Sequence, residues 1–171
     1  MPHACRQHCI GLVVLVAAFV ATDAGAGVSL AISPESTVVD PGAEFTVDIL
    51  LSESGDPING YDAVVGYDPL RLELILPVPR SAGERPLFTD ACPQRFVNLS
   101  VAGDSTAVTV SHVLLCAGVA VTGPGATYQL RFRARGITGQ THLTFLDGTA
   151  AYDAGEYVEP LETRDATVWI G

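Results

Sequence analysis

Apolar and polar residues alternate along most of the chain after residue 27. Between Phe45 and Leu51 every second residue is apolar, and Thr46 and Asp48 lie between them. A period of two is typical of strands that bury one face. Turn formers such as Asp40-Pro41-Gly42 separate these runs. The pattern predicts eight or nine short strands, at residues 28–32, 45–51, 61–67, 70–76, 95–102, 107–115, 128–134, 142–146 and 165–170.

These segments follow one another without a convincing crossover helix. Short strands joined by regular turns pack as two sheets whose inner faces form a common core. We therefore expect an all-β fold, an antiparallel two-sheet β-sandwich, with a jelly roll as the favoured form. In the segment at 128–134, apolar residues alternate with Gln129, Arg131 and Arg133, so the outer face of that strand should carry an arginine stripe.

The stretch INGYDAVVGYDPLRLELIL, residues 58–76, contains two Tyr-Asp pairs. The alternation directs Tyr61, Ala63, Val65 and Tyr67 into the core, and directs Asp62, Val64 and Gly66 outwards. Asp68 precedes a proline and should begin a turn. Six residues of strand separate Asp62 from Asp68 by about 20 Å, whereas glycoside hydrolysis needs carboxyl groups about 5 to 9.5 Å apart. The two aspartates are not a catalytic pair.

The first 26 residues have the features of a secretory signal peptide. Arg6 precedes an apolar run from Ile10 to Ala21, and Ala24-Gly25-Ala26 fits the small-x-small cleavage rule. An uncleaved anchor is the alternative, but about 12 apolar residues are short for a bilayer. We expect cleavage after Ala26, which leaves one domain at residues 27–171, secreted and without a membrane anchor.

The net charge and the cysteines restrict the classes of partner and the cellular compartment. The formal net charge is −10, and every basic side chain is arginine. Such a surface repels phosphate backbones and anionic lipid, which argues against a nucleic-acid partner or a membrane-surface role. Cys5 and Cys9 leave with the signal peptide. The remaining pair, Cys92 and Cys116, is expected to form a disulfide in an exported chain, with two buried free thiols as the alternative.

The segment INGYDAVVGYDPLRLELI resembles the third and fourth strands of cohesin domains, in which an Asp-aromatic-x-Val-x-Tyr-Asp-Pro run occurs. The C-terminal segment YQLRFRARGITGQTHLTFLDGTAAYDAGEYVEPLETRDATVWIG is similar to the second half of the same family. The similarity covers residues 28–171. It implies a nine-stranded jelly roll and a non-enzymatic module that binds the calcium-loaded dockerin domain of a polysaccharide-degrading enzyme.

The resemblance also implies a binding face. The family's contact aspartate on the third strand corresponds to Asp62, whereas Gly60 stands where the family has an asparagine. Val64 and Gly66 share the outer face of Asp62. The fifth and sixth strands add looser candidates, which are Asn98, Ser100, Thr109 and Ser111. The cysteine pair and the segment LPVPRSAGERPLFTDACPQR depart from the family pattern.

Catalytic and metal-binding patterns are weak. Ser105 lies in AGDSTA, which lacks the second glycine of a nucleophile elbow, and His112 and His142 are isolated in strands. We expect no cofactor. Calcium is a possible ligand of one acidic loop, but the spacing is not that of an EF-hand and a solvated loop is favoured. The acidic residues of that loop are Asp147, Asp153, Glu156 and Glu159.

Direct binding of a polysaccharide is the main alternative to a protein partner. Sugar-binding modules present aromatic rings on their surface, and the candidates are Trp169, Tyr152 and Tyr157. The other tyrosines and most phenylalanines fit the core better.

Overall fold

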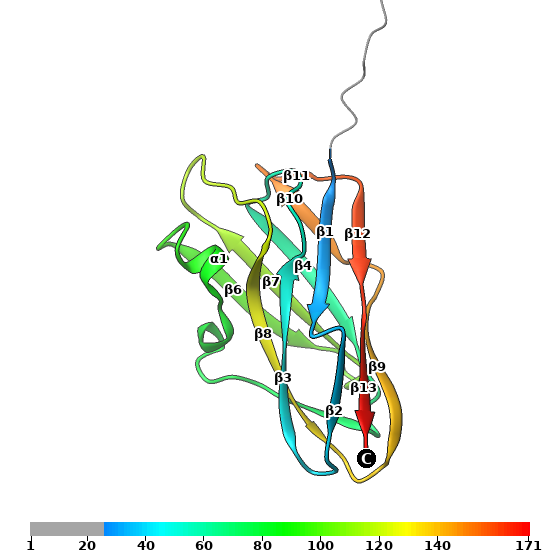
Figure 1. Ribbon diagram of the computed structural model, residues 1–171. Coiled ribbons are helices and arrows are strands. Elements are labelled where there is room, and N and C mark those ends of the chain that lie inside the picture. Colours follow the sequence, from blue (N-terminus) through cyan, green and yellow to red (C-terminus); the bar gives the residue numbers. More distant parts are fainter. Residues whose placement is uncertain (1–25) are drawn as a thin grey trace, which may run out of the picture.

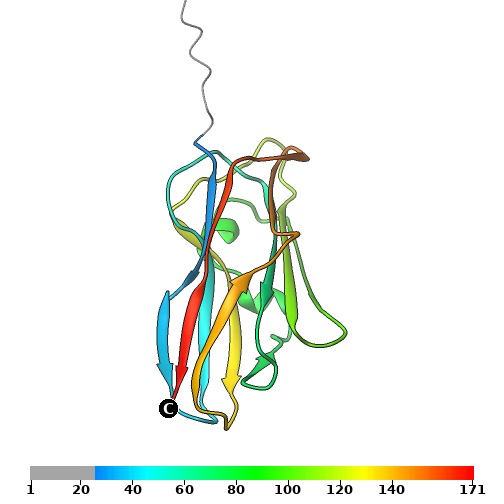
Figure 2. The ribbon, with the colours of Figure 1, turned by 90° about the vertical axis from the view of Figure 1, so that its right-hand side faces the viewer.

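The protein folds as two β-sheets packed face to face (Figures 1 and 2). The structure, a computed structural model, describes residues 26–171, so the expected signal peptide lies outside the described residues apart from Ala26. Within this range no helix is long and apolar enough to cross a bilayer. The two packed sheets confirm a β-sandwich as the fold class.

The smaller sheet has five strands in the order β12-β1-β3-β8-β5. These strands are β12 (Leu161–Arg164), β1 (Val28–Ser33), β3 (Glu44–Leu51), β8 (Gly125–Ala134) and β5 (Leu72–Ile75). Its outer face carries the expected arginine stripe, because Arg131 and Arg133 alternate with buried Leu130 and Phe132. Glu44 of β3 pairs with both arginines, so the stripe is largely neutralised.

The larger sheet has eight strands and is built around β4 (Gly60–Gly66). One edge of β4 pairs with β7 (Ala107–Leu114), which pairs with β6 (Arg95–Val101). The other edge of β4 pairs with β10 (Ala150–Asp153) and then with the end of β9 (Gly139–Phe145). Beyond these strands lie β11 (Glu156–Tyr157), β13 (Ala166–Ile170) and β2 (Ser36–Val39).

The expectation of nine antiparallel strands was wrong in count and in pairing. The structure has 13 strands, and the four that the alternation missed are β2, β10, β11 and β12. Each of these has two to four residues, which is too short for a periodic pattern. Two strand pairs, β1 with β12 and β2 with β13, are parallel. Alternation cannot reveal this, because it does not encode the direction of a neighbouring strand.

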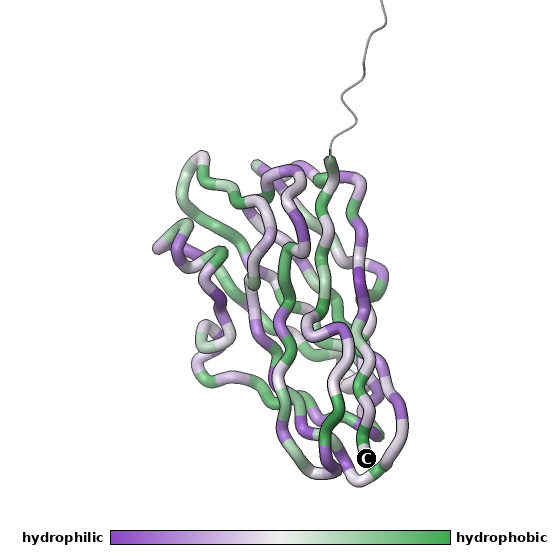
Figure 3. The backbone as a smooth tube through the Cα atoms, in the orientation of Figure 1, coloured by the Kyte–Doolittle hydropathy of each residue, from purple (hydrophilic) through white to green (hydrophobic). Residues whose placement is uncertain are grey.

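The core lies between the two sheets and follows the predicted faces. Tyr61, Ala63 and Val65 are fully buried, and Tyr67 is nearly so. Asp68 begins the expected turn. Its carboxylate accepts a hydrogen bond from the N–H of Leu70, and its carbonyl accepts one from the N–H of Leu72. Along the strands, hydrophobic and hydrophilic positions alternate in Figure 3. The side chains that alternate with the buried ones therefore lie on the outer faces of the sheets.

Residues 76–94, which connect β5 to β6 and which we call the insertion, close one side of the sandwich beside β6 and β8 (Figure 1). It contains a 3-10 turn, η1 (Arg80–Gly83), and a single helical turn, α1 (Pro86–Thr89). Phe88 of α1 is fully buried, and Glu84 forms a β-bridge with Tyr128 of β8. The insertion is therefore part of the core, although it departs from the family pattern.

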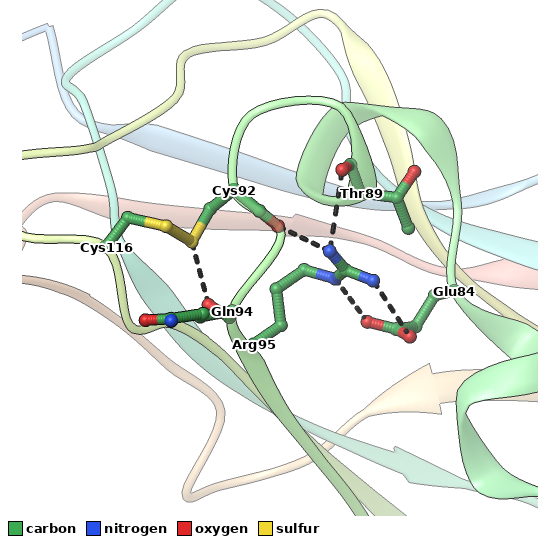
Figure 4. Close-up of a disulfide and its surroundings, with 6 residues drawn as sticks. All are labelled: Glu84, Thr89, Cys92, Gln94, Arg95 and Cys116. Carbon is green, nitrogen blue, oxygen red and sulfur yellow. Dashed lines mark hydrogen bonds and ion pairs between the residues drawn. A yellow bond between two sulfur atoms is a disulfide. The ribbon is translucent and has the colours of Figure 1, made fainter.

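A disulfide joins the insertion to the end of the β6–β7 hairpin (Figure 4). Cys92 and Cys116 are bonded, with Cα atoms 5.9 Å apart, which confirms the predicted pairing. Next to it, Arg95 Nε donates to Glu84 Oε1 at 2.7 Å, and the same guanidinium donates to the carbonyl of Cys92. The disulfide thus holds the insertion to the end of β7, and the ion pair holds it to the start of β6.

Candidate functional site

The outer face of the larger sheet brings most of the predicted binding residues together. Directly paired residues of antiparallel strands share a face, with Cβ atoms about 4.5 to 5.5 Å apart. Ser111 of β7 pairs with Asp62 on one side and with Asn98 of β6 on the other. In the next row Thr109 pairs with both Val64 and Ser100. Six of the seven predicted partner-binding residues therefore form two adjacent rows.

Asp62 is the centre of the first row and is held in place by two hydroxyl groups. Ser111 Oγ donates to Asp62 Oδ1 at 2.5 Å, and the hydroxyl of Tyr152 donates to Oδ2 at 2.8 Å. Burial, together with the neighbouring carboxylate, raises the pKa of Tyr152 to about 12, so this hydroxyl stays a donor at neutral pH. The carboxylate is half-buried and retains lone pairs for a further donor.

Gly66 does not present an open surface, which corrects one part of the expected site. The side chain of Leu146, from the turn after β9, covers it so closely that an added Cβ would lie 2.9 Å from Leu146 Cδ1. Val64 is only half-buried, and its N–H donates to Thr149 Oγ1 from the same turn. The accessible face therefore ends near Val64 rather than at Gly66.

A row of aromatic and aliphatic residues borders the Asp62 row and was not predicted as part of it. The pairing places Tyr152 and Val113 on either side of Gly60, with Phe96 of β6 beyond Val113. Tyr157 pairs with Tyr152 at a ring centroid distance of 5.2 Å. Phe96 could have been found from the sequence, because the alternation from Arg95 to Ala102 directs it to the same side as Asn98 and Ser100.

This aromatic row is accessible at both ends. Phe96 is 52% exposed and Tyr157 is 69% exposed. At its centre Gly60 is buried, and an added Cβ there would lie 3.1 Å from Val113 Cγ2, so Val113 and Tyr152 form the middle of the row. We call the three rows together the Asp62 face, which comprises Asp62, Val64, Phe96, Asn98, Ser100, Thr109, Ser111, Val113, Tyr152 and Tyr157.

The Asp62 face carries little charge compared with the opposite side of the molecule. On β4, β6 and β7, Asp62 is the only outward residue with an ionisable side chain. On the smaller sheet, Arg133 pairs with Glu44 at 2.6 Å and with Glu73 at 3.5 Å. Low charge with exposed aromatic residues is typical of the centre of a protein interface.

The sugar-binding candidates do not form one aromatic platform. Trp169 pairs with Gln140, four residues before Thr144 on β9, and Thr144 pairs with Gly66. Tyr152 pairs with Gly60, six residues away along β4. Ten residues of strand at about 3.3 Å each separate Trp169 from the two tyrosines by about 30 Å. The loop predicted to hold Tyr152 and Tyr157 is the β10–β11 hairpin.

The two histidines and the acidic loop lie in separate places. His112 is fully buried on the inner side of β7, where its Nε2 lies 3.0 Å from Glu84 Oε1, whereas His142 is exposed on β9. Ser105 lies in the turn of the β6–β7 hairpin, as predicted. Within residues 26–171, no group of three or more His, Cys, Asp or Glu side chains is placed to hold a metal ion.

No family model matches the chain, and no curated protein matches it. The structure, however, is similar to solved cohesin domains. A non-cellulosomal cohesin from the hyperthermophilic archaeon Archaeoglobus fulgidus superposes with a TM-score of 0.63 at 18% identity, covering 85% of this chain and 92% of that chain. The cohesin CaCohA2 from Clostridium acetobutylicum superposes with a TM-score of 0.64 at 16% identity, with the same coverage.

A third similar structure is a type I cohesin–dockerin complex from Clostridium thermocellum. Its TM-score is 0.61 at 15% identity, and the match covers 85% of this chain and 99% of that chain. The predicted resemblance is thus confirmed at the level of the fold. The chain has the β-sandwich of cohesin domains.

Proposed function

We propose that this domain, which has the cohesin fold, is a non-catalytic module that binds a dockerin-type protein through the Asp62 face. One observation carries the proposal. The residues that the cohesin resemblance assigns to the partner, apart from Gly66, lie in adjacent rows on the one outer face that is nearly free of charge. Cohesins of this fold have been solved in complex with dockerins, which supports this class of partner.

The surroundings of Asp62 support a role in recognition rather than in catalysis. Its two hydroxyl partners fix the carboxylate and leave it facing outwards between a polar row and an aromatic row. Such an arrangement suits a partner that presents a hydrogen-bond donor between apolar groups. Because Ser111 and Tyr152 each donate a hydrogen bond to the carboxylate, its charge is stabilised without a basic residue of this chain beside it.

The proposal includes export through the signal peptide at residues 1–26 and a role in extracellular polysaccharide degradation. The disulfide between Cys92 and Cys116 supports an oxidising compartment, because such bonds are rare in the reducing cytosol. Direct polysaccharide binding by Tyr152 and Tyr157 is disfavoured, because their rings are tilted by 43° and the Tyr152 hydroxyl is engaged with Asp62.

The experiment is a binding titration against a panel of calcium-loaded dockerin domains encoded in the same genome, measured by calorimetry. We expect at least one dockerin to bind, and Asp62→Ala to weaken that binding by about 2 kcal/mol or more while the thermal midpoint is retained. Arg133→Ala, on the opposite sheet, is the matched control and should bind like the unmodified protein. Unchanged affinity of Asp62→Ala for a verified dockerin would remove Asp62 from the site.

A further inference from the structure

A second feature of the larger sheet is a hollow that the Asp62 face does not use. It has a volume of about 520 Å³ and is lined by residues of β9 and of two neighbouring turns. The residues that matter here are Gly66, Asp68, Gln140, His142, Thr144 and Leu146. This volume lies within the range of about 300 to 1,000 Å³ that is typical of small-ligand sites.

The hollow exists because β4 and β9 separate. They pair only at Val65 with Phe145 and at Gly66 with Thr144, and the chain then turns away at Asp68. In the described part of the chain, residues 139–143 of β9 therefore have no strand on the side that faces β4. Gly66 contributes no side chain to the floor, and Leu146 forms the wall towards the Asp62 face.

An arginine lies at the far end of the unpaired edge of β9. Arg71 Nη1 donates to the carbonyl of Thr138 at 2.6 Å and to that of Ile137 at 3.3 Å. The open edge of β9 is thus limited to about five residues, or roughly 16 Å.

The polar groups of the hollow are free to bind a ligand. Within residues 26–171, the side chains of Gln140 and Thr144 and the Nε2 atom of His142 have no hydrogen-bond partner, while His142 Nδ1 faces Thr167 Oγ1 at 3.4 Å. The one carboxylate, Asp68, already accepts from the N–H of Leu70 and faces Arg71 at 3.6 Å. The free groups are an amide, a hydroxyl and an imidazole, which suit a ligand rich in hydroxyl groups rather than an ion.

An exposed indole lies beside Gln140, one strand away from the residues that line the hollow. Trp169 of β13 pairs directly with Gln140 on the same face and is 46% exposed. On its other side it pairs with Val38 of β2, which is 74% exposed. A tryptophan half-exposed beside free polar groups offers an apolar surface together with an N–H donor. Saccharides have apolar ring faces and hydroxyl groups at their edges. The ring face matches the indole, and the hydroxyl groups match the free polar groups of β9.

We propose that this hollow, with Trp169, Gln140, His142 and Thr144, is a binding site for a neutral saccharide. The sugar ring packs on the indole, and its hydroxyl groups bond to the amide, hydroxyl and imidazole groups of β9. About four residues of β4 separate Asp62 from Gly66 on the floor of the hollow, or roughly 13 Å. The site is therefore separate from the Asp62 face and does not depend on dockerin binding.

The chain contains a single tryptophan, so its fluorescence reports on this site alone. The experiment titrates the purified protein with xyloglucan, mixed-linkage β-glucan and galactomannan, and with polygalacturonate as an anionic counterpart. We expect a saturable change in Trp169 emission with at least one neutral polysaccharide. Gln140→Ala and His142→Ala should each raise the Kd by about tenfold, which corresponds to about 1.4 kcal/mol of binding free energy.

Two control variants separate this site from the rest of the sheet. Asp62→Ala and Tyr157→Ala should bind the neutral polysaccharide as the unmodified protein does, and circular dichroism should show that all variants are folded. The proposal is overturned if none of the three neutral polysaccharides changes the emission, or if only polygalacturonate does. Full binding by the Gln140→Ala/His142→Ala double variant would also overturn it.

Discussion

The imidazole of His112 lies fully buried on the inner side of β7, against the ring of Phe88 at a centroid distance of 4.5 Å. Burial lowers its pKa to about 4, although Glu84 opposes this shift. The neutral ring donates from Nε2 to Glu84 Oε1, and Nδ1 has no partner within the described residues. Burial alone would raise the pKa of Glu84, but Arg95 and His112 together hold it below its ordinary value.

These surroundings predict a loss of stability in mild acid. Because the pKa of His112 is about 4 in the folded state and near 6.5 in the unfolded state, only the unfolded chain takes up this proton between these values. The free energy of unfolding should therefore fall as the pH is lowered from about 6.5 to about 4, by at most about 3 kcal/mol from this residue.

The measurement is urea unfolding at several pH values in this range. His112→Gln keeps a donor for Glu84 but removes the titrating group, so its stability should change less with pH. His142→Gln, on the exposed part of β9, is the control and should behave like the unmodified protein. An unaltered pH slope in His112→Gln would contradict the assignment.

Much of the Asp62 face could be predicted at the scale of residues. Alternation places Asp62 and Val64 outwards, and the hairpin turn after Ala102 brings Asn98 and Ser100 beside Thr109 and Ser111. The cover over Gly66 could not be predicted in this way. Leu146 follows it by 80 residues, and only the path of the turn after β9 brings the two together.

At the scale of elements, the insertion packs through a contact that tolerates only glycine. A Cβ on Gly83 would lie 2.4 Å from Cζ of Tyr128, whose hydroxyl donates to the carbonyl of Arg80 at 2.6 Å. We expect Gly83→Ala to lower the free energy of unfolding by about 1 to 3 kcal/mol, because the core must shift to accept the methyl group. Gly136, with open space around it, supplies the matched control.

Gly136→Ala should change the stability by less than about 0.5 kcal/mol. Both variants can be compared by chemical unfolding under the same conditions. Equal stability of Gly83→Ala and Gly136→Ala would show that the insertion does not need this close packing.

The disulfide constrains the β6–β7 hairpin and the insertion together. It closes a loop with a sequence separation of 24 residues between Cys92 and Cys116. Loop-closure entropy predicts that Cys92→Ser/Cys116→Ser lowers the free energy of unfolding by about 3 kcal/mol. Urea unfolding of the double variant, beside the unmodified protein, measures this difference. A loss below about 1 kcal/mol would mean that the ion pair between Arg95 and Glu84 holds the insertion without the covalent bond.

The elements themselves were only partly predictable. The long strands follow from alternation, and the bond between Cys92 and Cys116 follows from an even pair of cysteines in a chain that is expected to be exported. The short strands β2, β10, β11 and β12 do not, because the turn formers beside them hide any period. The parallel pairs β1–β12 and β2–β13 form because residues 28–39 and 161–170 each run from the smaller sheet into the larger one, which is a tertiary property.

At the scale of the whole molecule, the two outer faces differ in character although the chain is acidic overall. Paired charges such as Glu44 with Arg133 cover the smaller sheet, whereas hydroxyl, amide and aromatic groups cover the larger one. An interface at the larger sheet desolvates few charges, which lowers the cost of binding. We therefore expect a dockerin-type partner to bind at the Asp62 face.

The most direct measurement of this claim is an NMR titration of the isotope-labelled protein with the dockerin that binds it in the calorimetric panel. We expect the amide shifts to change on β4, β6, β7 and β10, with the largest changes around Asp62, Ser111 and Asn98. Amides on β3, β5 and β8 should change little. Shifts concentrated on those three strands, with β4 and β7 unaffected, would contradict the central claim.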